Sequence, residues 1–120
     1  GHDIVMEIDW QGARQIRAHY ADTFSVFILP PSLKILRERL ERRAQDSKEV
    51  INSRMQQAMS EAKHFNEYDY VIVNDDFDRA SAEFISVLSR SINESEVAAS
   101  RELVNKTLKA LGLNNRSNDE

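Results

Sequence analysis

Residues 24–32 read FSVFILPPS, and this stretch decides the fold. Its opening run, FSVFIL, is apolar almost without interruption and rich in aromatic and β-branched side chains, which is typical of a strand buried on both faces of a parallel sheet. Pro31 and Ser32 then end the strand and supply a helix N-cap. The residues that follow carry a leucine stripe with helical spacing, which predicts a helix over 32–43: Leu33, Leu36 and Leu40.

Two other apolar runs have the same character, at Ile4–Ile8 and Tyr70–Val73. Asp46, with Glu49 three residues later, resembles a capping box at the start of a helix. Segments with helical spacing lie between and after the apolar runs: 11–20, 47–66 and the residues that follow a cap at Asp76. Strands that alternate with helices predict an α/β fold in which three parallel strands are flanked by helices.

The composition indicates one globular domain, because hydrophobic residues make up 41% and charged residues 30% of the 120 residues. The formal net charge of −4 argues against a protein that binds nucleic acid through bulk basicity. Every apolar run is far shorter than the roughly 20 residues of a membrane helix, so we expect no membrane association. Cysteine is absent, which fits a reducing compartment, and we expect the cytoplasm.

Residues 93–120 follow a different pattern. We predict one more amphipathic helix there, ended by Gly112 and built on this apolar stripe: Val97, Val104, Leu108 and Leu111. The polar residues after that helix form a tail. We therefore divide the chain into a core at 1–92 and an extra helix with a polar tail at 93–120.

Acidic and amide side chains follow two of the three predicted strands. In EIDWQG, residues 7–12, Glu7 and Asp9 are two positions apart and share one face of a strand. Another strand ends in Asn74–Asp76, and ligands of open α/β sheets bind beyond the carboxyl ends of the strands. Each group also has an ordinary structural explanation. Glu7 would face solvent or an arginine, Asp9 would cap the next helix, and Asn74–Asp76 would form a turn with a cap.

Arginines gather around the short polar break AQDS at residues 44–47. Arg39 and Arg43 are four positions apart on one helix face, and Arg54 lies about two turns into the next helix. A helical hairpin would bring these three guanidinium groups toward one point, where they could bind phosphate oxygens. The alternative is a solvated helical face whose arginines form salt bridges. Combined with the acidic strand ends, the pattern favours phosphoryl transfer, which depends mainly on positioning and charge.

Four motifs, in order and at the right separations, resemble the carboxyl-terminal half of bacterial guanylate kinases. They are EIDWQGARQIR (7–17), FILPPS (27–32), RERLERRAQDSKEVINSRM (37–55) and YDYVIVNDDFDRA (68–80). The resemblance extends over residues 3 to about 92. It implies a P-loop nucleoside monophosphate kinase fold, and an enzyme that converts ATP and GMP into ADP and GDP with Mg²⁺.

The resemblance also implies a helical lid over about residues 38–54, which closes over ATP, and roles for single residues. The lid residues that match the arginines reaching the transferring phosphate are Arg43 and Arg54. The residues that match the adenine side of the ATP site are Arg39, Asn74 and Asp75. The residues that match the acidic strand end near GMP and the water shell of the metal are Glu7 and Asp9. None of these residues is implied to be a direct metal ligand.

The sequence departs from the family pattern in two respects. Ala44 stands where bacterial members have glycine, so we expect a slightly different turn at the lid tip. The phosphate cradle G-x-x-x-x-G-K-[ST] is absent, because none of the three glycines lies in such a motif. We interpret the chain as a guanylate kinase fragment whose cradle and GMP-binding insert lie upstream of Gly1. We expect it to be inactive alone, and to self-associate through an exposed sheet edge.

A non-catalytic guanylate-kinase-like interaction module is the alternative function. Such modules resemble the enzymes in fold but often lose the lid arginines and the acidic site residues. This chain keeps both groups, which favours the enzyme. We therefore expect ATP and GMP as its ligands, and no nucleic acid.

Overall fold

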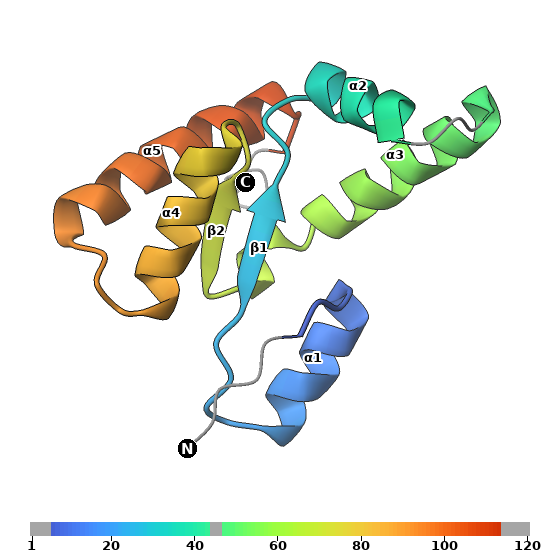
Figure 1. Ribbon diagram of the computed structural model, residues 1–120. Coiled ribbons are helices and arrows are strands. Elements are labelled where there is room, and N and C mark those ends of the chain that lie inside the picture. The colour runs from blue at the N-terminus through green and yellow to red at the C-terminus, as the bar shows by residue number, and fades with distance from the viewer. Residues whose placement is uncertain (1–5, 44–46, 114–120) are drawn as a thin grey trace, which may run out of the picture.

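The computed structural model describes residues 6–43 and 47–113. In chain order the elements are α1 (Trp10–His19), β1 (Val26–Leu29), α2 (Leu33–Arg43), α3 (Lys48–Ala62), the short 3-10 helix η1 (Phe65–Glu67), β2 (Tyr70–Val73), α4 (Phe77–Leu88) and α5 (Glu94–Ala110). Helices α4 and α5 lie beside β2, and the α2–α3 hairpin extends from the other side of the sheet (Figure 1).

Strands β1 and β2 form a parallel pair, as the two apolar runs predict. The register pairs Val26 with Tyr70 at one end and Leu29 with Val73 at the other. Leu29, Ile72 and Val73 are almost completely buried, so the continuous apolar pattern reflects burial within the fold. The backbone N–H of Asn74 donates to the carbonyl of Leu29 (2.9 Å), which extends the pairing beyond the end of β2.

The prediction of a third strand at Ile4–Ile8 is wrong for the part of it that the structure describes. Ile4 and Val5 lie outside the described residues, and residues 6–9 have no regular secondary structure. Met6 is 56% exposed and Ile8 is 42% exposed. A strand needs a neighbour that pairs its backbone N–H and C=O groups, and residues 6–8 pair with neither β1 nor β2.

Side-chain caps set the starts of α2 and α4 where the sequence predicts them. The Ser32 hydroxyl accepts the N–H of Ile35 (3.1 Å), and the Asp76 carboxylate accepts the N–H of Arg79 (3.0 Å). Both caps satisfy donors that the first turn of a helix cannot pair internally.

Helix α3 differs from its prediction at both ends. Its N-cap is Ser47, whose hydroxyl accepts the N–H of Val50 (3.3 Å), whereas the predicted cap Asp46 lies outside the described residues. The α-helix ends at Ala62, and the chain then tightens into η1, where one helix through residue 66 was expected. The apolar spacing continues through this change because a 3-10 turn also returns side chains to one face after about three residues.

The core is a cluster of buried side chains between the sheet, α3 and α5: Leu29, Ala62, Val73, Val104, Leu108 and Leu111. Asn93 and Glu96 form a capping box at the start of α5. Gly112, at φ +77°, ends the helix as predicted, since it adopts a left-handed conformation that favours glycine. Helix α5 and its C-cap residue Leu111 therefore supply half of the core cluster. The boundary drawn at residues 92 and 93 stays a prediction.

Strand β1 has one edge without a strand partner in the described ranges 6–43 and 47–113. It pairs only with β2, and Ile28 at its centre is 46% exposed. An unpaired, apolar strand edge can pair with another chain. This geometry agrees with the exposed edge expected from the sequence, and the expected self-association stays a prediction.

Candidate functional site

The end of β2 and helix α2 meet at Asn74. The Arg39 guanidinium donates from Nη1 to the main-chain carbonyl of Asn74 (2.9 Å), across 35 positions of sequence. Both residues are partly buried. The structure thus brings together two of the predicted adenine-side residues, and it does so through the backbone of one of them. This bond places the arginine-bearing hairpin at the carboxyl end of the sheet.

Asp75 is held by Arg79, a residue that the sequence analysis did not single out. Arg79 donates from Nε to Asp75 (2.9 Å) and from Nη1 to Glu83 (2.8 Å), and its Nη2 bonds the carbonyl of Val73. Partial burial raises the pKa of Asp75, but the hydrogen bonds from Arg79 and from the Asp76 backbone outweigh it and lower the pKa overall. The sequence signal for these two ion pairs was the spacing of four residues from Asp75 to Arg79 and from Arg79 to Glu83.

Arg37 joins the two helices of the predicted lid. Its Nη1 donates to Asn52 of α3 (2.9 Å) and lies 3.5 Å from the Met55 sulfur, while its Nε forms an ion pair with Glu41 (3.4 Å). The sequence pattern assigned no role to Arg37. It is a cross-link between α2 and α3 of the hairpin.

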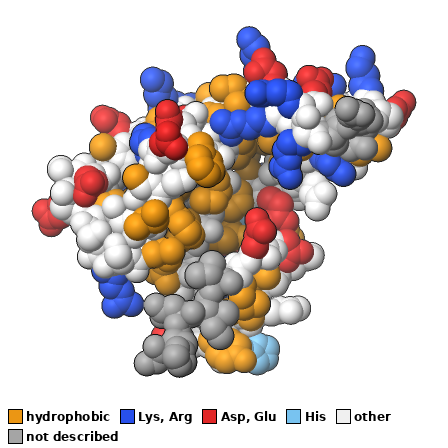
Figure 2. Space-filling model, viewed as in Figure 1, with side chains coloured by type: hydrophobic (Ala, Val, Ile, Leu, Met, Phe, Trp, Pro, Cys, Tyr) orange, Lys and Arg blue, Asp and Glu red, His pale blue; other side chains and the backbone are white. Residues whose placement is uncertain are grey.

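Arg43 and Arg54 lie on the two helices of this hairpin. Arg43 ends α2, Arg54 lies in the second turn of α3, and both residues are exposed. Lysine and arginine side chains gather over the α2–α3 region of the surface (Figure 2). Of the predicted lid tip at residues 44–47, Ser47 caps α3, and residues 44–46 lie outside the described residues. The roles of Arg43 and Arg54 stay predictions.

Glu7 and Asp9 are exposed, and they lie in a different part of the structure. Asp9 caps α1, because its Oδ1 accepts the N–H of Gly12 (2.7 Å). A Cβ atom at Gly12 would lie 3.2 Å from that same oxygen, so glycine suits the position. Figure 1 shows α1 beside the amino-terminal end of β1. Asn74 follows the carboxyl end of β2, at the opposite end of this parallel pair. The described contacts therefore do not bring Glu7 and Asp9 together with Asn74–Asp76, because residues 6–8 do not join the sheet.

Helix α1 is attached to the end of α3 and to η1 by a set of polar and aromatic contacts that we call the α1 anchor: Trp10, Arg14, Glu61, His64 and Glu67. Arg14 binds Glu67 through both Nε (2.8 Å) and Nη2 (2.7 Å), and the ring of His64 lies 2.7 Å from the same carboxylate. The hydrogen bonds from Arg14 and then from His64 lower the pKa of Glu67 from 4.5 to about 2.

We expect the stabilisation that the Glu67 contacts give to the fold to be complete above about pH 4.5 and to decline below it. The pKa of Glu67 is lower in the folded chain than in the unfolded chain. The ionised group therefore favours folding fully above about pH 4.5, and this contribution is lost as the pH falls toward about 2. Thermal unfolding of the chain and of Glu67→Gln, compared across this range, measures the effect. The Tm difference should shrink on acidification, and a difference that is independent of pH would contradict the prediction.

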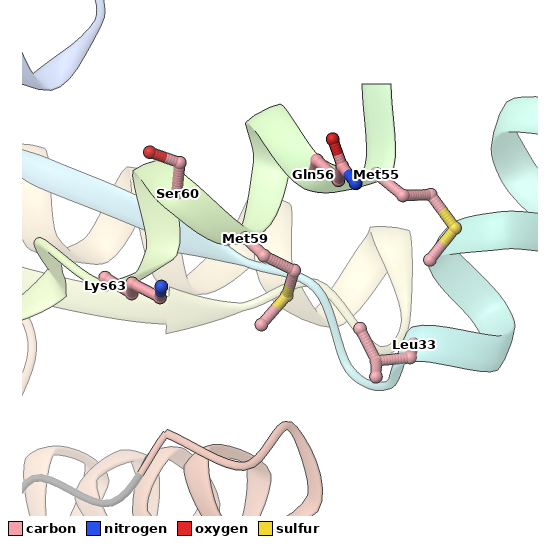
Figure 3. A pocket seen from close by; sticks show the side chains of 6 residues that line it. All are labelled: Leu33, Met55, Gln56, Met59, Ser60 and Lys63. Carbon is pink, nitrogen blue, oxygen red and sulfur yellow. The ribbon is translucent and has the colours of Figure 1, made fainter. Parts of the chain in front are cut away.

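A shallow apolar groove lies between α2 and α3, lined by Leu33, Met55, Gln56, Met59, Ser60 and Lys63. In Figure 3, Met55 and Met59 extend from α3, and Leu33 from α2, toward the space between the helices. The predicted site residues are not among its lining residues, so the groove is separate from the candidate site.

No helix within residues 6–43 and 47–113 is long and apolar enough to cross a membrane. The same residues contain no group of three or more histidine, cysteine, aspartate or glutamate side chains that could hold a metal ion.

Comparisons with known proteins agree with this fold. The guanylate kinase family model matches residues 1–91. A crystal structure of guanylate kinase from Anaplasma phagocytophilum superposes with a TM-score of 0.54 at 31% identity, covering 82% of this chain and 47% of that one. The predicted fold class, an incomplete α/β kinase fold with a parallel sheet, is thereby confirmed, with two strands in the described part instead of three.

Curated guanylate kinases are similar over most of the chain. The guanylate kinase of Pseudomonas savastanoi pv. phaseolicola is 60% identical over 77 residues, which are 64% of this chain and 36% of the relative. That of Alkalilimnicola ehrlichii is 48% identical over 111 residues, 92% of this chain and 54% of the relative. The chain spans about half the length of the curated relatives it matches, or less. It belongs to the guanylate kinase family.

Proposed function

We propose that this chain is the lid and adenine-side part of an enzyme that transfers the γ-phosphoryl group of ATP to GMP. The observation that carries the proposal is the hydrogen bond from Arg39 to the carbonyl of Asn74. It places a hairpin rich in guanidinium groups over the carboxyl end of a parallel sheet, which is where ligands of such sheets bind. Phosphoryl transfer needs cations positioned around the moving group, and arginine supplies them.

The proposal assigns the residues to three parts of the site. Arg43 and Arg54 would neutralise charge on the transferring phosphoryl group, since their guanidinium groups stay protonated at physiological pH. The Asn74 segment, held by Arg39 and Arg79, would line the adenine side. Because Arg39 and Arg79 donate hydrogen bonds to the main-chain carbonyls of Asn74 and Val73, the segment is already held in place and would need little reorganisation when ATP binds.

Glu7 and Asp9 would serve the GMP side and the water shell of Mg²⁺. Magnesium enters such sites with the phosphates of ATP and keeps several of its waters. Asp9 suits this indirect role, because it is exposed and uses Oδ1 for the Gly12 amide, which leaves Oδ2 for a water molecule. Bound magnesium would supply charge neutralisation and phosphate orientation. The absence of cysteine is compatible with the reducing cytoplasm, where we propose that the reaction takes place.

We expect the isolated chain to show no GMP-dependent release of ADP, and a chimera to restore it. The chimera joins this chain to the amino-terminal half of the Alkalilimnicola ehrlichii guanylate kinase, which is expected to supply the phosphate cradle and the guanine site. A coupled assay of ADP, with AMP in place of GMP as the control substrate, measures the activity. A folded chimera that binds nucleotide but transfers no phosphate would contradict the enzyme and favour the non-catalytic interaction module.

A further inference from the structure

Helix α1 depends on the α1 anchor for its position. Ala13 is its only buried residue, so apolar packing holds it weakly. Arg17 adds further polar contacts: it lies 3.4 Å from the Ser25 hydroxyl, 3.5 Å from Glu67 and 5.6 Å from the centroid of the Tyr68 ring. The amphipathic pattern of this segment therefore does not explain how the helix is fixed, and polar contacts must do so.

The first residue of α1 is attached in two ways, once to α3 and once to His64, which lies between α3 and η1. The backbone N–H of Trp10 donates to Glu61 (3.2 Å), which satisfies one of the free donors at the helix start. The indole of Trp10 also stacks on the ring of His64, with centroids 3.7 Å apart and planes at 11°. Stacked rings at this separation make a favourable contact and fix the orientation of both groups.

Glu67 is the centre of the remaining contacts. Its carboxylate accepts hydrogen bonds from Nε and Nη2 of Arg14 and lies against His64, and the Arg14 guanidinium also lies 4.7 Å from the centroid of the Trp10 ring. A single exposed ion pair contributes little to stability. A bidentate pair that shares its carboxylate with a second partner has a defined geometry as well as a favourable energy.

We propose that the α1 anchor is a positioning device, which holds the helix capped by Asp9 at a fixed place relative to the helix that carries Arg54. Asp9 directly precedes Trp10, and Arg54 and Glu61 lie about two turns apart on the uninterrupted helix α3. Movement of α3 is therefore transmitted to Asp9 through Glu61 and His64. This inference rests on the proposed function, because it links the GMP side of the site to the lid.

The kinetic test uses Glu67→Gln in the chimera. Glutamine keeps the shape of the side chain and removes the charge that binds Arg14. We expect the KM for GMP to rise about tenfold, with the KM for ATP unchanged within about twofold and kcat lowered by less than about threefold. A merely structural role would reduce the active fraction and leave both KM values unchanged. Arg14→Ala should raise the KM for GMP by a similar factor, and the double variant by no more than either single one.

Hydrogen exchange in the isolated chain provides a second measurement, independent of activity. In Glu67→Gln, backbone amides of α1 should exchange about tenfold faster, while those of α4 keep their rates. Glu102→Gln is the matched control, because Glu102 is exposed on α5 and lies outside the α1 anchor. Unchanged exchange in α1, or faster exchange with an unchanged KM for GMP, would overturn the proposal. An inactive parent chimera counts against the proposed function alone, and the exchange rates then decide whether the anchor holds α1.

Discussion

Replacing Arg54 by alanine in the active chimera should lower kcat about a thousandfold, while the chimera stays folded. An arginine that stabilises the charge of a phosphoryl group in flight contributes about 10³–10⁵ to the rate, because the interaction is strongest in the transition state. Arg54 is exposed on α3, so its loss removes little packing. The measurement is kcat at saturating ATP and GMP, with thermal unfolding to check the fold.

Arg43→Ala should have an effect of similar size, and Arg42→Ala is its matched control. The two arginines are neighbours in the last turn of α2, both are exposed, and each substitution removes one positive charge. Adjacent residues point about 100° apart around a helix, so only one of them can face the site. Equal losses in the two variants would indicate a general effect of charge and would remove Arg43 from the proposed catalytic residues.

The second large effect concerns stability. Leu108→Ala should lower the free energy of unfolding by about 2–5 kcal/mol, because the side chain is only 2% exposed and its removal leaves a cavity in the core. For a small domain this is a large share of the total stability. Urea unfolding of the isolated chain followed by circular dichroism measures it, with Lys109→Ala as an exposed control on the same helix.

The same measurement tests how residues 93–113 belong to the fold. The guanylate kinase family model ends at residue 91, yet α5 packs its buried side chains against β2 and α3. Deleting the chain from residue 93 onward should therefore prevent folding of the remainder. If Leu108→Ala leaves the urea midpoint unchanged, α5 is not part of the cooperative core. The predicted division into a core at 1–92 and an extra helix with a tail at 93–120 would then describe the chain better.

Local patterns in the sequence predicted the elements that depend on local interactions. The runs at Val26–Leu29 and Tyr70–Val73 form strands, and Ser32 and Asp76 cap the helices that follow them. Caps and turn residues act within one helical turn, so the sequence displays them directly. The run at Ile4–Ile8 has the same local character, but a strand also needs a paired neighbour, and residues 6–8 have none among the residues that the structure describes.

The arrangement of the candidate site depended on contacts that sequence patterns do not record. The resemblance assigned Arg39 and Asn74 to the same side of the site, but the hydrogen bond from the Arg39 guanidinium to the main chain of Asn74 has no sequence pattern of its own. The contacts from Trp10 to Glu61 and from Arg14 to Glu67 join residues 51 and 53 positions apart. Each of these side chains alone resembles a solvated surface residue. Their partners become visible only when the chain is folded.

The bond between Arg39 and Asn74 has a consequence for protein engineering. Its acceptor is a peptide oxygen, which every amino acid carries, so a substitution at position 74 keeps the acceptor that holds α2 in place. If Asn74 lines the adenine side, as proposed, its side chain can be varied to test base preference while this attachment of α2 is retained. A change at position 39 itself, or a displacement of the main chain, would break this hydrogen bond.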